Sequence, residues 1–313
     1  MATRSHHAPV LTNRWPELPL AAWRDTRDTL HMWMQIIGKV RLAITPVINH
    51  WWNVPLYVSE RGFTTMAMSH NNQTFSMELD FLDDVLRIMP EDGRERTVVL
   101  GPRSVADFYA AVMAELRDAG LEVKIWPMPV EIANPIRFEL DDVHHSYDKE
   151  YVLRFWQIVA HATEVFTKFR ARFIGKASPV MWFWGTFDLS VSRFSGRRAP
   201  PLYGASRIEQ EAYSHEVSSL GWWPGDSRLE KASFYSYVAP EPAGYAKATI
   251  MPAEAYYHPL LKGWYLDHDA VRASPNPDQT LLDFAESTYE AAATLANWNR
   301  PDLERAEPIY HHP

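Results

Sequence analysis

The sequence predicts an α+β protein of two related halves, each a helix, an antiparallel meander and a second helix, packed around a shared crevice. A motif that occurs twice, and a helix–strands–helix order around each copy, predict this architecture. The length of 313 residues also exceeds the size at which one hydrophobic core usually stops growing. We expect the halves at residues 15–142 and 143–299, a disordered arm at 1–14 and a disordered tail at 300–313.

The repeated motif begins with Ile-Gly-Lys after a segment with helical spacing. Measured from the proline that follows, Val, Trp, Leu and Val recur at offsets of 1, 5, 10 and 12 in both copies. Facing halves form concave, aromatic-lined crevices, so the motif indicates where a site would lie. The copies comprise Ile37-Gly38-Lys39, Pro46-Val47, Trp51, Leu56 and Val58, and Ile174-Gly175-Lys176, Pro179-Val180, Trp184, Leu189 and Val191.

The first half opens with a helix at about 21–39. Apolar residues from Trp23 to Ile37 keep helical spacing, and Gly38 is the expected stop. After the break at Pro46, alternating apolar and polar residues separated by turn residues predict a meander. Its strands are expected at about 53–59, 62–68, 74–82, 84–89 and 97–100.

A second helix and a connection complete the first half. Ser104, three residues before Asp107, predicts a helix start, and this helix extends to Arg117. Residues 121–126 predict a returning strand. Residues 127–142 hold three prolines and no sustained period, so we expect a connection between the halves there.

The second half repeats this order. A long apolar stripe predicts a helix at about 148–173, and a final helix is expected at 279–297 with Asp278 as its cap. A proline-rich and tyrosine-rich segment precedes this last helix. Strands are expected at about 180–193, 212–219 and 232–238.

Composition excludes several classes of protein. A formal net charge of −8 argues against a general nucleic-acid binder, which needs a basic surface. The absence of cysteine excludes disulfides and thiolate chemistry. No apolar run of about 18 residues and no secretory signal are readable, so we expect a cytoplasmic protein without membrane contact. The unusual feature is the count of 13 tryptophans.

Five further motifs stand out: Trp15-Pro16-Glu17-Leu18-Pro19, Lys39-Val40-Arg41-Leu42-Ala43, Asn49-His50-Trp51-Trp52-Asn53-Val54-Pro55-Leu56-Tyr57, Phe194-Ser195-Gly196-Arg197-Arg198-Ala199-Pro200-Pro201 and Glu211-Ala212-Tyr213-Ser214-His215-Glu216-Val217-Ser218-Ser219. In these motifs the chain resembles a bacterial family of unknown function, domain-of-unknown-function family 5996, over residues 15–298. The resemblance brings no established reaction. It extends to enzymes of antibiotic pathways that close small nitrogen rings by expelling sulfate, although no motif here confirms that chemistry.

The segment 213–223 is the best candidate for catalysis. Alternate side chains of a strand share a face, so Tyr213 and His215 point one way while Glu216 and Ser218 point the other. The face with Glu216 and its flanking serines is the more polar one, where a carboxylate serves as a general base. His215 is a second catalytic candidate. The alternative is that Glu216 pairs with an arginine and ties strands together.

Aromatic clusters occur at matching places in the two motif copies. Stacked indoles suit a ligand pocket and a core equally well, and core packing is the simpler interpretation. His50 stands where the second copy has Phe183, so it is a third catalytic candidate, and Asp188 stands where the first copy has Pro55. The indoles expected to contact a substrate are Trp51, Trp52, Trp182 and Trp184.

Arginines provide candidate contacts for an anionic group. Arg197 and Arg198 follow a turn of small residues, and Arg193 precedes it. Guanidinium groups fork around carboxylate, sulfate or phosphate. With Asp188, Tyr213 and Ser218 they complete the predicted substrate-binding set. A solvated basic loop is the alternative.

These residues lead to three functional hypotheses. The first is a cofactor-free enzyme for a small polar, anionic metabolite, in which Glu216 takes a proton while sulfate or phosphate leaves in a displacement, an elimination or a ring closure of secondary metabolism. The second is a metal-dependent hydrolase or oxygenase with His and carboxylate ligands. The third is a non-catalytic binding protein. No metal-ligand or nucleotide motif is present, and a homodimer or heterodimer remains open.

Overall fold

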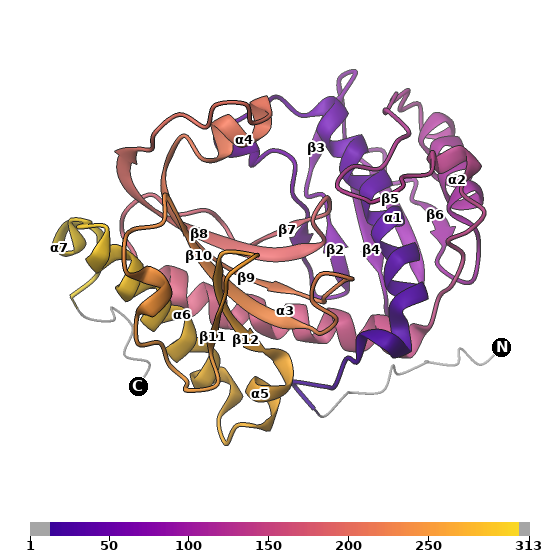
Figure 1. Ribbon diagram of the computed structural model, residues 1–313. Helices are drawn as coiled ribbons and strands as arrows, with labels where there is room; N and C mark the ends of the chain where they lie inside the picture. The colour runs from indigo at the N-terminus through magenta and orange to yellow at the C-terminus, as the bar shows by residue number, and fades with distance from the viewer. Residues whose placement is uncertain (1–12, 307–313) are drawn as a thin grey trace, which may run out of the picture.

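Two antiparallel sheets form the framework, which the computed structural model describes for residues 13–306 (Figure 1). The prediction of an α+β fold is therefore confirmed, whereas a duplication of two related halves is not. The first sheet has the order β1-β2-β4-β5-β6, with β3 also paired to β4, and the second has the order β11-β12-β10-β9-β8-β7. The strands are β1 (Tyr57–Val58), β2 (Gly62–Thr64), β3 (Met68–His70), β4 (Gln73–Asp80), β5 (Val85–Pro90), β6 (Arg96–Val99), β7 (Met181–Phe183), β8 (Asp188–Arg198), β9 (His215–Trp223), β10 (Ser233–Ala239), β11 (Tyr256–His258) and β12 (Gly263–Asp267).

Helices cover one face of the second sheet and leave the other open. In Figure 1, α3 passes beneath this sheet and α6 lies beside it, while α1 lies in front of the first sheet. The open face of the second sheet is where the site forms. The helices are α1 (Leu20–Ile44), α2 (Val105–Asp118), α3 (Lys149–Ala171), α4 (Arg207–Ala212), α5 (His268–Ala273), α6 (Pro277–Leu295) and α7 (Arg300–Leu303), with short 3₁₀ turns η1 (Asn49–Trp51), η2 (Phe138–Leu140) and η3 (Tyr245–Lys247).

The two sheets meet edge to edge at one backbone bridge. Leu56, just before β1, and Trp182 of β7 exchange two N–H···O bonds of 2.9 Å each. Both side chains are fully buried, and Trp182 packs against Phe63 and Phe155. The halves therefore share one continuous core.

Gly38 is not a helix stop, contrary to the sequence prediction. The first helix continues through it to Ile44. A Cβ at this position would lie 2.2 Å from Nε1 of Trp184, so the glycine allows the indole to approach the helix backbone. Close packing, rather than termination, explains the residue.

The capping residues of the helices agree with the sequence prediction at two of three places. Ser104 accepts a hydrogen bond from the Asp107 N–H, and Asp148 caps α3. The final helix begins earlier than expected, with Asn276 rather than Asp278 as its cap. Residues 121–126 form no strand, and β11 and β12 lie in the proline-rich segment where no strand was predicted.

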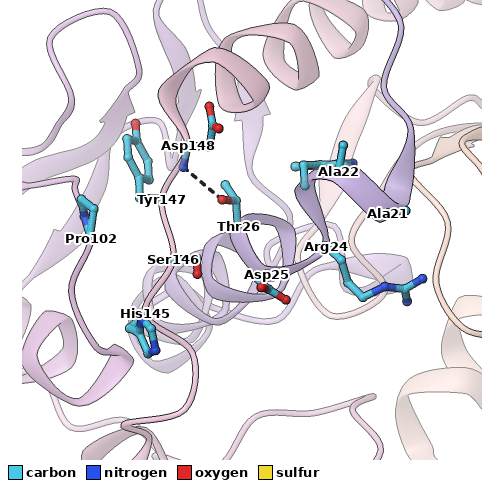
Figure 2. A pocket seen from close by; sticks show the side chains of 11 residues that line it. Ala21, Ala22, Arg24, Asp25, Thr26, Pro102, His145, Ser146, Tyr147 and Asp148 are labelled. Atoms are coloured by element: carbon cyan, nitrogen blue, oxygen red, sulfur yellow. Dashed lines mark hydrogen bonds between the residues drawn. The ribbon is translucent and has the colours of Figure 1, made fainter.

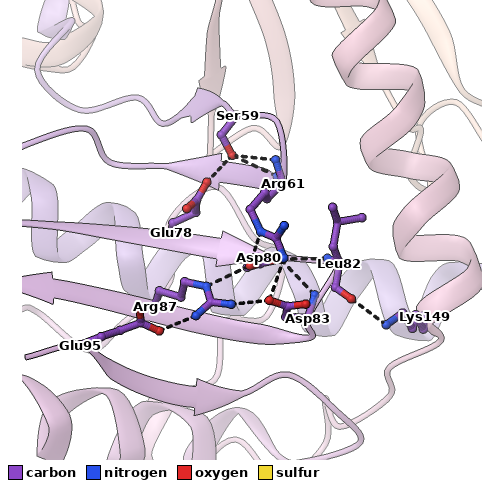
Figure 3. A network of polar contacts seen from close by, with 10 residues as sticks. Ser59, Arg61, Glu78, Asp80, Leu82, Asp83, Arg87, Glu95 and Lys149 are labelled. Carbon is purple, nitrogen blue, oxygen red and sulfur yellow. Dashed lines mark hydrogen bonds and ion pairs between the residues drawn. The ribbon is translucent and has the colours of Figure 1, made fainter. Parts of the chain in front are cut away.

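A buried carboxylate organises the hairpin at the end of β4. Asp80 accepts hydrogen bonds from Nε of Arg61 and Arg87, at 2.5 and 2.9 Å, and from the backbone N–H groups of Leu82 and Asp83 (Figure 3). Full satisfaction by charged and backbone donors makes this a structural network.

The ends of the chain lie only partly within the described residues. Most of the arm predicted at 1–14, and residues 307–313 of the predicted tail, fall outside them. Residues 300–303 form α7, and Glu304 pairs with Phe173 in a backbone bridge. Across residues 13–306, none of the helices is long and apolar enough to cross a membrane.

Candidate functional site

A cavity of about 890 Å³ lies between α1, η1, the segment 124–131 and the open face of the second sheet. Residues of both halves of the chain line it, as the crevice predicted from the sequence requires. The connection between β8 and β9, which includes α4, closes another side. This volume suits a small metabolite.

Hydroxyl groups and one carboxyl cover the floor of the cavity. Because strand side chains alternate, Asp188, Ser190 and Ser192 of β8 face the cavity while Leu189 and Val191 face the helices. Further polar groups come from neighbouring strands, and they bond to each other: Ser192 to Ser219 at 2.7 Å, and Tyr213 to Tyr237 at 3.0 Å.

Asp188 is held by a tyrosine that reaches across a strand. Tyr235 of β10 donates a hydrogen bond to Asp188 of β8, and Thr186 donates another. β9 lies between these strands, and Gly221 stands directly opposite Tyr235 in register. A Cβ at Gly221 would lie 2.1 Å from the Tyr235 ring. Only glycine leaves room for the ring to cross β9.

The carboxyls of the cavity bind protons more tightly than usual. Burial raises the pKa of Asp188, although hydrogen bonds from Thr186 and Tyr235 act in the opposite direction. Burial, followed by the charge of Asp188, raises the pKa of Glu131, which also lines the cavity, while Arg228 opposes this shift. Carboxyls with raised pKa values are typical of acid–base sites.

Indoles form much of the wall. Trp184 donates from Nε1 to the backbone oxygen of Val54 at 3.0 Å, which fixes its ring against α1. Trp126 also faces the cavity and is 64% exposed, so it stands at the rim. The indoles that line the cavity are Trp51, Trp52, Trp126, Trp184 and Trp223.

Lys39 is a buried amine on the wall formed by α1. Its side chain reaches the cavity between two indoles, with Nζ 5.2 Å from the Trp126 ring and 5.8 Å from the Trp184 ring. The residue is only 4% exposed. Burial lowers the pKa of Lys39 to about 8.

His50 lines the cavity, but both of its ring nitrogens have protein partners. Nδ1 lies 3.0 Å from the oxygen of Ala212, and Nε2 lies 2.5 Å from Nζ of Lys176. Burial lowers the pKa of His50, and the charge of Lys176 acts in the same direction. A neutral ring that donates from Nδ1 fits both contacts. His50 thus anchors η1 to α4 and has no nitrogen free for a substrate.

His50 and Trp51 have left-handed backbone angles, with φ of 57° and 60°. Such conformations are strained for residues with a side chain and cluster at functional sites. The strain here belongs to the turn that presents the wall residues of η1.

Glu216 and the arginines around it lie outside the cavity. The predicted alternation of β9 is observed, but the face with Ser218 and Glu216 is turned toward the helices. Arg197 donates to Glu216 at 2.7 and 2.9 Å and also to the backbone oxygens of Ala296 and Asn297, just after α6. This corresponds to the alternative in which Glu216 ties elements together. Arg198 is exposed, in register with His215.

Two other residues that were predicted to contact a substrate lie in the protein core. Arg193 is 1% exposed, and its guanidinium carbon lies 3.4 Å from the centroid of Phe169 beneath the sheet. Trp182 is fully buried at the seam between the sheets. His215 contacts the ring of His50 but is not part of the cavity wall. The structure therefore brings together His50, Trp51, Trp52, Trp184, Asp188 and Tyr213 of the predicted set.

The sequence reasoning missed Lys39 as a site residue, and it missed Glu131, Arg228, Tyr235 and Tyr237 altogether. Lys39 had a visible signal, because it belongs to the repeated motif beside Gly38. The alternation of tyrosines in residues 233–239 was another signal. Nothing in the sequence indicates that the segment 124–131 folds over the second sheet.

A second hollow of about 470 Å³ lies at the N-terminal turn of α1, against residues 145–148 (Figure 2). The Asp148 N–H donates to the hydroxyl of Thr26 there, at 3.0 Å. Its acidic residues, Asp25 and Asp148, are exposed. It holds no buried carboxyl, so the larger cavity is the candidate site.

A metal site would need several ligands in one place. Within residues 13–306, no group of three or more His, Asp or Glu side chains is arranged to hold a metal ion. His50, the histidine of the cavity wall that such a metal enzyme would use, is instead bonded to Lys176 and Ala212.

Comparison with known sequences gives one match. Residues 15–305 match DUF5996, described as a family of unknown function. No curated protein and no solved structure matches the chain significantly.

Proposed function

We propose that this chain, which belongs to the DUF5996 family, is an enzyme that holds a small polar metabolite in the cavity and transforms it by acid–base chemistry of its own side chains. One observation carries the proposal: a buried carboxyl, Asp188, faces the cavity with a raised pKa. A carboxyl of this kind exchanges protons at a pH closer to neutrality than an exposed one.

Asp188 is the proposed general base, in place of Glu216. Hydrogen bonds from Tyr235 and Thr186 fix the orientation of its carboxylate. Burial, followed by the charge of Asp188, keeps the pKa of Tyr235 well above its ordinary value, so the phenol stays a donor. Glu131, whose pKa is raised as well, is the second proton-carrying group.

The reaction that fits these groups is an intramolecular displacement. The carboxylate of Asp188 takes a proton from an amine or hydroxyl of the substrate, whose lone pair forms a bond to a neighbouring carbon. The bond from that carbon to a sulfate or phosphate oxygen breaks, and its electron pair leaves with the anion. The cavity wall includes the guanidinium of Arg228, which is paired with Asp226 and is the proposed contact for this charge.

The first test pairs Asp188→Asn with Glu216→Gln. A metabolite that raises the melting temperature of the wild type identifies a ligand, and its conversion is then followed by mass spectrometry. We expect Asp188→Asn to lower turnover by about 10²- to 10⁴-fold and to keep binding, because the amide retains the shape but cannot take a proton. Asp142→Asn, which changes an exposed carboxyl outside the cavity, is the matched control.

Two results would contradict the proposal, one for the identity of the base and one for catalysis itself. Loss of turnover in Glu216→Gln with full turnover in Asp188→Asn would return the role of base to Glu216. A ligand that binds tightly and is never converted would favour the non-catalytic binding protein, which the indole-rich wall also suits.

A further inference from the structure

Lys39 is a buried lysine without a counter-charge among the described residues. It projects from the interior of α1 into the cavity and is 4% exposed. Within residues 13–306 it takes part in no ion pair, whereas Lys149 pairs with Asp84 and Lys168 pairs with Glu164. Buried ammonium groups are ordinarily paired, so an unpaired one requires a chemical explanation.

The surroundings favour the neutral amine. Burial lowers the pKa of Lys39 to about 8. At pH 7 about a tenth of such side chains are unprotonated, which is roughly two hundredfold more than for an exposed lysine. A neutral amine is a nucleophile, and desolvated lysines are the ones that form imines with carbonyl compounds.

Two indoles flank the amine of Lys39. Trp184 is held by its bond to Val54 and by its contact with Gly38, one residue before Lys39. Trp126, on the other side, is largely exposed, so the amine lies close to the rim of the cavity. Indole faces attract cations, and a protonated imine remains a cation after the bond has formed.

We propose that Lys39 is a nucleophilic site that forms an imine with a small aldehyde or ketone bound in the cavity. The amine nitrogen attacks the carbonyl carbon, a C–N bond forms, and the carbonyl oxygen takes a proton to give a carbinolamine. The hydroxyl then takes a second proton and leaves as water while the C=N bond forms. The amine supplies two protons in total, so one amine and one carbonyl give one imine and one water.

Reductive trapping in the full-length protein tests this site. Propanal and sodium cyanoborohydride are added at pH 7, 8 and 9, and the alkylated lysines are identified and timed by peptide mass spectrometry. The reagent supplies the hydride that converts the imine to a stable secondary amine. We expect Lys39 to react at least about tenfold faster than Lys149 and Lys168, with a half-maximal rate near pH 8.

The wild-type comparison does not depend on any variant folding. Labelling of Lys39 no faster than that of Lys149 would overturn the proposal. Lys39→Arg, which keeps the charge, should lose the fast label and leave the slower lysines unchanged. Asp188→Asn should keep the fast label, so failure of this site and failure of the proposed base are distinguishable. Fast labelling of Lys124 instead, which also lines the cavity, would equally overturn it.

Discussion

Asp188 links the chemistry of the site to folding stability. The folded state binds the proton of this carboxyl more tightly than the unfolded state, whose pKa is the ordinary 3.8. The contribution of this carboxyl to stability is therefore lost as pH rises from 3.8 through its raised folded pKa, and Asp188→Asn lacks that contribution. The free energy of unfolding of the variant, relative to the wild type, should increase between pH 4 and pH 8 in urea titrations.

Asp142→Asn provides the baseline for this comparison, since an exposed carboxyl should show no such trend. A constant difference between Asp188→Asn and the wild type across the pH range would mean that the Asp188 carboxyl titrates normally.

His31 holds the backbone turn that carries Trp184 and Gly185 of the cavity wall. It is fully buried in α1, with Nε2 2.9 Å from the oxygen of Trp184 and 3.0 Å from that of Gly185, in the turn that lines the cavity. Burial, reinforced by the charge of Arg27, lowers the pKa of His31 to about 3. The turn between β7 and β8 thus depends on a neutral histidine.

The lowered pKa of His31 predicts that the folded state loses stability in acid. Below pH 6.5 the His31 ring is protonated in the unfolded state but stays neutral in the folded state. Its contribution to the free energy of unfolding therefore falls by about 1.4 kcal/mol for each unit that the pH decreases, until the pH approaches 3. Urea unfolding between pH 7 and pH 4 should show a shallower dependence in His31→Gln than in the wild type. His145→Gln, at an exposed position, should retain the wild-type slope. Equal slopes for all three proteins would contradict the prediction.

Single residues explain which parts of the site were predictable. Trp51, Trp52, Trp184 and Asp188 were found because they belong to the repeated motif or break its pattern. Glu131 was not found, because its place in the cavity depends on the path of a connection that has no periodic signal.

The secondary-structure elements were predicted best where a local signal determines them. Ser104 and Asp148 begin helices through side-chain caps, which depend only on neighbouring residues. The alternation along β9 was also local and correct. Which face of β9 receives helices depends on α3 and α6, far away in the sequence, and this is why the polarity of the face with Glu216 did not show which face meets the cavity.

Substitution of Gly38 tests the close packing of α1 against Trp184. In Gly38→Ala the new methyl group would overlap the indole of Trp184, which must then move away from α1. We expect a net destabilisation of about 1–3 kcal/mol, although alanine has the higher helix propensity. Urea denaturation measures the loss, and tryptophan fluorescence reports the displaced ring.

Gly101→Ala is the matched control, because a Cβ there meets only Val99, at 4.0 Å. It should change stability by less than about 0.5 kcal/mol. A Gly38→Ala protein more stable than the wild type would show that Trp184 does not need the close approach.

The whole molecule has one core rather than two. A single buried cluster extends from Trp15 to Trp298, and the sheets join through Leu56 and Trp182. Residues 1–142 expressed alone should therefore show no cooperative urea transition, since they expose the α1 surface that packs on the second half. The full chain should unfold in one transition by circular dichroism and by fluorescence. A separately folded fragment would contradict this expectation.

The crossing of Tyr235 over Gly221 also limits which residues related sequences can carry at these two positions. The ring and a side chain at position 221 would compete for the same space, so a larger residue at 221 requires the tyrosine at 235 to move or to be replaced. In related chains, a larger residue in place of Gly221 would indicate that the tyrosine no longer reaches the carboxyl of β8. The pair then serves as a marker, readable from sequence alone, that separates relatives that retain this tyrosine–carboxyl contact from those that have lost it.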